Sequence, residues 1–222
     1  MRAAAICGLE AEARIARRAG LAARACGGIA QSTLAAAQSL LADGADALVS
    51  FGIAGALAPH LASGALLLPR AVIDHDGNAH RVSEEWRARV EASLAAAGLH
   101  AEAGDLFGAI AAVGAREAKE ALFRSNGAVA VDLESHLVAR AAESASRPFL
   151  VLRAVADSAL QTLPPAALID LKPCGAPALG RVLASILRDP RQIPALLRLA
   201  SDTRRALFAL RSAVGAGAIA SA

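Results

Sequence analysis

The sequence has few aromatic and few sulfur-containing side chains. Its 222 residues include no tyrosine, and only 3% are aromatic. Sites that bind single-stranded nucleic acid stack the bases on aromatic side chains, so this composition argues against a nucleic-acid partner. The three cysteines, Cys7, Cys26 and Cys174, are odd in number and lack the spacing of metal ligands. This cysteine usage is typical of a protein of the reducing cytoplasm.

Lysine and long uncharged runs are also scarce. The formal net charge is +3, and the basic excess is nearly all arginine, because Lys119 and Lys172 are the only lysines. No stretch of about 18 apolar residues is free of charge, so no membrane-spanning helix is expected. The apolar run Ala3–Cys7 is too short for the core of a signal peptide. We therefore expect a cytoplasmic protein, with peripheral membrane contact as the alternative.

Hydrophobic residues, in contrast, make up 55% of the chain and charged residues 19%, which predicts a folded chain with a sizeable core. Short apolar runs alternate with longer helical patterns. The expected strands are 3–7, 47–51, 65–68, 71–73, 107–113, 128–131 and 149–156, and the expected helices are 9–18, 33–42, 86–97, 117–124, 134–143, 177–187 and 194–211. This alternation predicts a single α/β domain over residues 1–222, with a central mixed β-sheet flanked by helices.

The C-terminal part has its own pattern. Residues 163–212 are expected to form a loop followed by basic amphipathic helices, and residues 213–222 a frayed tail. Seven arginines and two acids lie between Arg181 and Arg211, interleaved with leucines. Such a helix lies on an anionic membrane or packs on the sheet or on a partner subunit, and the sequence leaves these alternatives open.

Three acidic residues come directly after expected strands. They are Glu12, Glu134 and Asp157. Ligands of α/β sheets bind beyond the carboxyl ends of strands, although for each acid alone the dipole at a helix start is the simpler explanation. Together with the glycine-rich turn Ser50–Leu57 they favour a ligand site. That turn matches neither the dinucleotide-binding fingerprint nor a P-loop.

The remaining polar residues give weaker signals. The five histidines form no HxxxH or HxH pair, so no metal site is expected. The segment Asp74–Asp76 precedes Gly77 and Asn78 and is expected to be a turn. His136 and Lys119 are expected on solvated helix faces.

Four segments carry a resemblance to a known family. Ile6–Glu12, Phe51–Gly55, Val131–Ser135 and Arg153–Asp157 resemble, in order and spacing, the nucleoside phosphorylase superfamily and its methylthioadenosine/adenosylhomocysteine nucleosidase-like branch. The resemblance covers roughly residues 2 to 160. The short chain and the ending after residue 163 are most similar to the hopanoid-associated phosphorylase, which removes adenine from adenosylhopane.

The resemblance implies a function and roles for the three acids. It implies cleavage of the N-ribosidic bond of a 5′-substituted adenosine, with Asp157 protonating purine N7 as adenine leaves. It implies that Glu134 binds the ribose hydroxyls and that Glu12 orients the attacking water. Further substrate contacts are implied at Leu9, Gly52, Ile53, Ala54, Val113 and Leu133. The resemblance also implies a homodimer and no cofactor, with phosphate as the one candidate co-substrate.

Some positions depart from the family pattern. Phosphorolytic members hold phosphate with an arginine and a serine where this chain has Ser50 and Ile53, so water and phosphate both stay open as the nucleophile. The serine that precedes the N7 acid in the family is Ala156. A methylthioadenosine/adenosylhomocysteine nucleosidase is the alternative function. A non-catalytic nucleoside- or lipid-binding protein on the same fold is a third hypothesis, suggested by Ile53 and Ala156.

Overall fold

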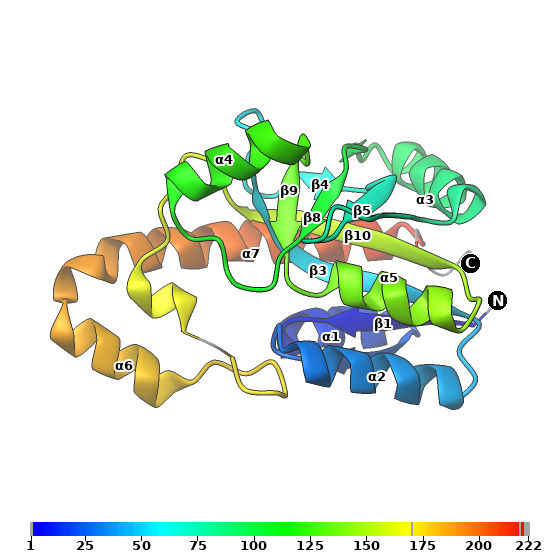
Figure 1. Ribbon diagram of the computed structural model, residues 1–222, viewed down its shortest axis with the longest axis horizontal. Helices are drawn as coiled ribbons and strands as arrows, with labels where there is room; N and C mark the ends of the chain where they lie inside the picture. The colour runs from blue at the N-terminus through cyan, green and yellow to red at the C-terminus, as the bar shows by residue number, and fades with distance from the viewer. Residues whose placement is uncertain (1, 170, 218, 220–222) are drawn as a thin grey trace.

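The structure is a computed structural model that describes residues 2–169, 171–217 and 219 (Figure 1). The strands are β1 (Ala3–Cys7), β2 (Ala22–Ala25), β3 (Ala47–Ala56), β4 (Leu66–Leu67), β5 (Ala71–Ile73), β6 (Ala79–Arg81), β7 (Ala101–Glu102), β8 (Leu106–Gly108), β9 (Ala130–Asp132) and β10 (Phe149–Asp157). The helices are α1 (Glu10–Arg18), α2 (Ala30–Ala42), α3 (Glu84–Ala96), α4 (Arg116–Asn126), α5 (Ser135–Ser144), α6 (Leu179–Arg188) and α7 (Ile193–Gly215), with short 3₁₀ turns η1 (Pro165–Leu168) and η2 (Pro190–Gln192).

The strands form one mixed sheet with β3 and β10 at its centre. The strand order is β6-β5-β8-β9-β3-β10-β4-β7, and β1 joins β3 and carries β2 on its other side. All nine residues of β10 are buried. A strand that is apolar on both faces needs cover on both sides of the sheet, and helices supply that cover here.

The edge of β3 that faces away from β10 changes partner along its length. The first part of that edge pairs in parallel with β1, up to Ile6 opposite Ser50. The last part pairs antiparallel with β9, where Gly55 lies opposite Val131. Between these two pairings, residues 51–54 of β3 have no neighbouring strand on that edge among the strands that the structure describes. We call this gap the β3 notch.

The helices cover the two faces of the sheet. Helices α2 and α5 pack on each other and lie in front of the strands in the view of Figure 1, and α7 runs behind β3 and β10. Helix α7 also packs on α1, and its residues Ala206, Leu210 and Ala213 are fully buried. Helix α6 has no buried residue. None of the described helices is both long and apolar enough to cross a membrane.

The expected architecture, a single α/β domain with a central mixed sheet and flanking helices, is confirmed. Several local expectations are wrong. The glycine-rich segment after Phe51 is not a turn but the second half of β3. The strand expected over 107–113 ends at Gly108 because its partner β9 ends at Asp132. Three short strands, β2, β6 and β7, were not foreseen.

The C-terminal segment also differs from the expectation. Helix α7 continues to Gly215, and Ala213 and Ile219 are buried, so the frayed tail does not begin at residue 213. Burial of these apolar side chains against the core holds this end in place. Residues 218 and 220–222 of the expected tail lie outside the described residues.

The packing of α7 leads to a stability prediction. Leu210 is fully buried under the sheet, whereas Phe208 on the same helix is 68% exposed. Leu210→Ala should lower the free energy of unfolding by about 2–5 kcal/mol, because it leaves a cavity in the core. Phe208→Ala, the matched control, should change it by less than about 0.5 kcal/mol. Urea denaturation measures both values, and equal effects of the two substitutions would mean that α7 does not pack as described.

Candidate active site

The loops after β1 and β9 enter the β3 notch from opposite ends. Strand β1 runs parallel to β3 and ends at Cys7, whereas β9 runs antiparallel to β3 and ends at Asp132. The carboxyl ends of the two strands therefore point toward each other across the notch. Because Glu12 and Glu134 each come shortly after one of these ends, the topology brings the two carboxylates to the same place.

Glu12 binds one backbone N–H of the β3 notch. Its carboxylate accepts hydrogen bonds from the backbone N–H of Leu9 at 2.7 Å and of Ile53 at 2.9 Å. The first bond caps the start of α1, and the second satisfies an N–H of β3 that has no strand partner there. The side chain is almost fully buried. Burial raises the pKa of Glu12, and the nearby Arg153 guanidinium partly opposes that rise.

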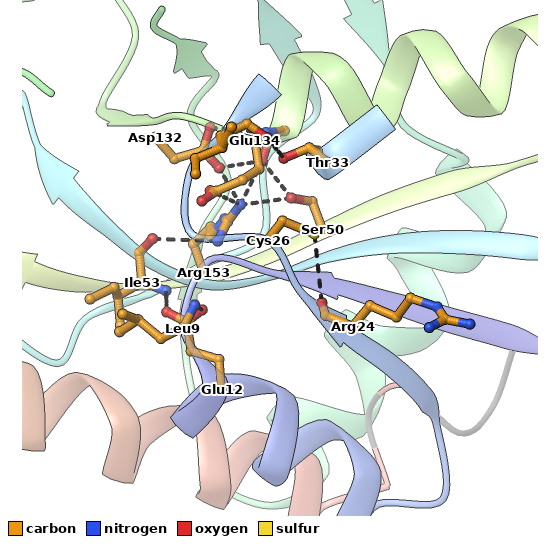
Figure 2. Close-up of polar contacts among 12 residues, drawn as sticks. Leu9, Glu12, Arg24, Cys26, Thr33, Ser50, Ile53, Asp132, Glu134 and Arg153 are labelled. Carbon is orange, nitrogen blue, oxygen red and sulfur yellow. Dashed lines mark hydrogen bonds and ion pairs between the residues drawn. The ribbon is translucent and has the colours of Figure 1, made fainter. Parts of the chain in front are cut away.

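Arg153 lies at the centre of a buried ion cluster, which also contains Asp132, Glu134 and Glu12. It comes from the middle of β10, and its side chain is 1% exposed. Its Nη2 atom donates to Ser50 Oγ at 2.7 Å and to Glu134 Oε2 at 3.1 Å, and it forms an ion pair with Asp132 Oδ2 at 2.5 Å (Figure 2). The guanidinium thus contacts the carboxylates of Asp132 and Glu134 directly, and the carboxylate of Glu12 lies near it. The desolvation of these charges is tolerable only because they are paired.

Glu134 has a strongly shifted pKa. It is the residue before α5 and is 5% exposed. Burial raises its pKa to about 7, and the charges of Asp132 and Glu12 act in the same direction while Arg153 acts against them. Near neutral pH this carboxyl therefore exists in both protonation states, which is typical of groups at functional sites.

Two glycines make room for the charged side chains. A Cβ atom at Gly8 would lie 2.6 Å from Glu134 Oε1. One at Gly52 would lie 2.5 Å from Arg153 Nη1 and 2.6 Å from Glu12 Oε2. Any larger residue at these positions would displace the ion cluster, so the space taken by the charges explains both glycines.

Asp157 stands apart from the ion cluster. It ends β10 beside Gly55, whereas Glu12 and Arg153 lie beside Gly52. Three residues of extended strand separate these positions, a distance of about 10 Å. Asp157 is 7% exposed, and burial raises its pKa, while the ammonium of Lys119 opposes the rise. The site thus has an ion cluster at one end and a single buried acid at the other.

The other expected contact residues divide between two places. Leu9, Gly52 and Ile53 surround Glu12, and Ala54 is buried in β3 beside them. Val113 and Leu133 are half-buried and pack with Leu57, Ala109, Ala128 and Val131 in a small apolar cluster. Val131 lies against Gly55, so this cluster borders the Asp157 end of the site.

Two expectations about polar residues are wrong. Lys119 is fully buried and forms an ion pair with Asp157, although it was expected on a solvated face. His136 is 3% exposed and lies edge-on to His75, with ring centroids 6.0 Å apart. Both lie on helix faces turned inward by the tertiary packing. Within the described part of the chain, no group of three or more histidine, cysteine or acidic residues is placed to hold a metal ion.

Sequence reasoning also missed the central role of Arg153 and its partner Asp132. One signal was present, because Arg153 interrupts an otherwise apolar strand pattern, Phe149–Ala156. A charge in the middle of a buried strand requires a buried partner of opposite charge.

Comparisons with known proteins agree with this fold. A sequence model of the phosphorylase superfamily matches residues 13–187. No curated protein matches the chain significantly.

Among solved structures, the 5′-methylthioadenosine/S-adenosylhomocysteine nucleosidase of Neisseria meningitidis, in complex with methylthio-immucillin-A, is 17% identical. The superposition covers 100% of both chains with a TM-score of 0.73. The futalosine hydrolase of Helicobacter pylori is 19% identical, with 96% of this chain and 97% of that chain covered and a TM-score of 0.67. A Helicobacter pylori MTAN mutant with 5′-methylthioadenosine in its active site is 17% identical, with 96% and 98% covered and a TM-score of 0.67.

The raised pKa of Glu134 leads to a prediction about pH. Because its pKa rises from 4.5 to about 7, the folded protein binds this proton more tightly than the unfolded chain. The free energy of unfolding should therefore fall as pH rises between these values, by up to about 3 kcal/mol from this residue. Glu134→Gln removes the titration, so the variant should gain stability relative to the wild type over the same range.

Urea denaturation at about pH 5 and about pH 8 measures this difference. Glu117→Gln, which removes an exposed carboxylate of α4, is the control and should show no pH-dependent difference from the wild type. Parallel stability curves for Glu134→Gln and the wild type would mean that Glu134 stays ionised throughout.

Proposed function

Because the chain belongs to the phosphorylase superfamily, it is an enzyme that cleaves glycosidic bonds of nucleosides, and we propose that its substrate is a 5′-substituted adenosine from which it releases adenine. The observation that carries the proposal is the arrangement of acids along β3. Asp157 lies at one end and the Glu12–Glu134–Arg153 cluster at the other, about 10 Å away. This separation suits a purine at the first end and its ribose at the second.

The two ends suit the charges that develop during bond cleavage. As the N-ribosidic bond breaks, negative charge grows on the purine and positive charge on the ribose. Asp157 protonates purine N7, and burial raises the pKa of Asp157, which favours the protonated form that this step requires. Glu134 accepts hydrogen bonds from the ribose hydroxyls and, when ionised, stabilises the positive charge on the ring.

We propose water as the nucleophile, oriented by Glu12. The Arg153 guanidinium already pairs with Asp132 and Glu134 and is near Glu12. A phosphate dianion would therefore enter a region where carboxylates outnumber the guanidinium, and Coulomb repulsion opposes its binding. The Ile53 side chain has no donor for phosphate, and its backbone N–H is bound to Glu12. Phosphate as a co-substrate is the alternative that the assay below separates.

For the 5′ substituent we propose a long hydrocarbon, with adenosylhopane as the leading substrate and 5′-methylthioadenosine as the runner-up. The segment between β10 and α6 lies across the loops of the site. Leu168 packs against Gly114, and the carbonyl of Gly175 accepts a hydrogen bond from the N–H of Glu10 at 3.3 Å. This segment leads into α6, which exposes apolar side chains. An apolar surface on the helix that follows this segment supports a substituent that must leave water to bind.

The exposed face of α6 also supports contact with a membrane. Leu179, Leu183 and Leu187 recur every fourth residue and are 72%, 57% and 73% exposed. They form one face of the helix, which we call the α6 leucine face. Arg181 and Arg188 lie on the opposite face, and both are exposed. A leucine face backed by arginines is typical of helices that lie in the interface of an anionic membrane. Helix α6 projects from the body of the molecule in Figure 1.

The function is tested by release of adenine from purified protein. The substrates are 5′-methylthioadenosine and adenosylhopane, each assayed with and without inorganic phosphate. We expect phosphate-independent release, faster with adenosylhopane. Asp157→Asn cannot deliver a proton and should reduce the rate by on the order of 100-fold or more, whereas Asp76→Asn, in an exposed turn, should not. An unchanged rate in Asp157→Asn would refute its role, and an absolute phosphate requirement would refute hydrolysis.

Membrane contact is tested by flotation with vesicles. We expect the protein to float with vesicles that contain phosphatidylglycerol and not with pure phosphatidylcholine. The double variant Leu183→Gln/Leu187→Gln should lose flotation, whereas Leu160→Gln, which changes another leucine that is 57% exposed, should keep it. A wild-type protein that does not float, but that loses a dimer in the double variant, would assign the α6 leucine face to a second copy of the chain.

A further inference from the structure

Lys119 is a fully buried lysine that contacts the proposed acid. It lies on α4, and its Nζ atom forms an ion pair with Asp157 Oδ2. The same atom donates hydrogen bonds to the backbone carbonyls of Ser158 and Gln161, both at 3.0 Å. The ammonium is thus surrounded by three acceptors, one of which is the carboxyl at the purine end of the site.

The contacts of Lys119 match the hydrogen-bonding groups of a lysine ammonium. A lysine ammonium has three N–H donors and no lone pair, whereas a neutral amine has two donors and one lone pair. The three oxygens in contact with Lys119 Nζ match the three donors of an ammonium, and an ionised Asp157 compensates its buried charge.

We propose that Lys119 is a positioning residue for the general acid: its ammonium fixes the Asp157 carboxyl and stabilises the negative charge left on it when it protonates the purine. The inference rests on the proposed function. In the step concerned, the O–H bond of Asp157 breaks and a bond from that proton to N7 forms. The electron pair of the C1′–N9 bond goes to the purine, and water supplies the new bond at C1′ while Glu12 takes its proton. Asp157 ends as a carboxylate paired with Lys119.

The other elements around Asp157 support this assignment. Asp202 of α7 is the second charged residue that acts on Asp157, and it raises the pKa of Asp157. Asp202 is itself held by the Gln161 side chain at 3.0 Å and by Arg205 at 2.8 Å. On β3, the neighbour of Asp157 is the uncharged Gly55. Lys119 is therefore the group that opposes both burial and Asp202 and keeps the carboxylate form accessible.

The contacts also fix the geometry of the acid. Lys119 ties α4 to the turn over residues 158–161, and the Gln161 side chain accepts the N–H of Ser158 at 2.9 Å. Gln161 then connects this turn to Asp202 of α7. Helix α4 thus contacts one oxygen of Asp157 directly, and α7 holds the turn that follows Asp157. Correct placement of an acid contributes to rate only when its position is held.

The test is the pH dependence of Lys119→Met, which keeps the length of the side chain and removes the charge. We expect kcat for adenine release to fall about 10- to 100-fold with little change in KM, because the interaction strengthens as charge develops on Asp157. The alkaline limb of the profile of kcat/KM against pH should move upward by about one unit, since Asp157 without its cation holds its proton to higher pH. Arg124→Met, which removes an exposed charge from the same helix, should change neither.

Each outcome decides the proposal. A fall in kcat with an unmoved alkaline limb would make Lys119 a structural residue only, and an unchanged kcat would overturn the proposal outright. Partial recovery of Lys119→Ala by added ethylammonium, but not by tetramethylammonium, is expected because the ammonium needs N–H donors. Where Lys119→Met does not fold, Lys119→Gln replaces it with the same expected shift. Failure of the proposed function would appear separately, as an unchanged rate in Asp157→Asn.

Discussion

The buried guanidinium of Arg153 is the interaction on which the rest of the site depends. It is held by the central strand β10 and pairs with Asp132 and Glu134, and its charge also acts on Glu12. Removing this cation would leave several carboxylates buried without compensation, which is strongly destabilising. The same cation keeps part of the Glu134 population ionised near neutral pH, although burial raises the pKa of Glu134 to about 7. The Arg153 guanidinium therefore contributes both to the stability of the fold and to the ionisation of Glu134.

The β3 notch explains why the charges gather where they do. Strand β1 leaves the edge of β3 after Ser50, and β9 joins it at Gly55 from the opposite direction. The backbone between them needs other hydrogen-bond partners, and Glu12 supplies one to Ile53. Gly52 lacks a side chain because the Glu12 and Arg153 groups occupy that space. The unpaired stretch of β3 thus lies between the acids at the two ends of the site.

Helical patterns in the sequence did not reveal which faces are buried. The sequence of the basic leucine-rich region after residue 163 is compatible with a membrane-bound helix and with a packed helix. The structure has one exposed helix and one packed helix in this region. Helix α7 packs on β10, whereas α6 has no buried residue. Lys119 was likewise expected in solvent because acids flank it, yet α4 turns it toward Asp157. Amphipathic periodicity defines two faces of a helix but not the partner of either face.

The sequence by itself determined the alternation of strands and helices, and with it the α/β class and the acids at the strand ends. Those features depend on local apolar patterns that run over a few residues. Only the tertiary structure decided that β9 is antiparallel to β3, and hence that Glu134 meets Glu12. It alone decided that Arg153 joins Asp132 and that Lys119 joins Asp157, pairs separated by 21 and 38 residues. Contacts at such separations depend on strand order and helix docking, which no local pattern encodes.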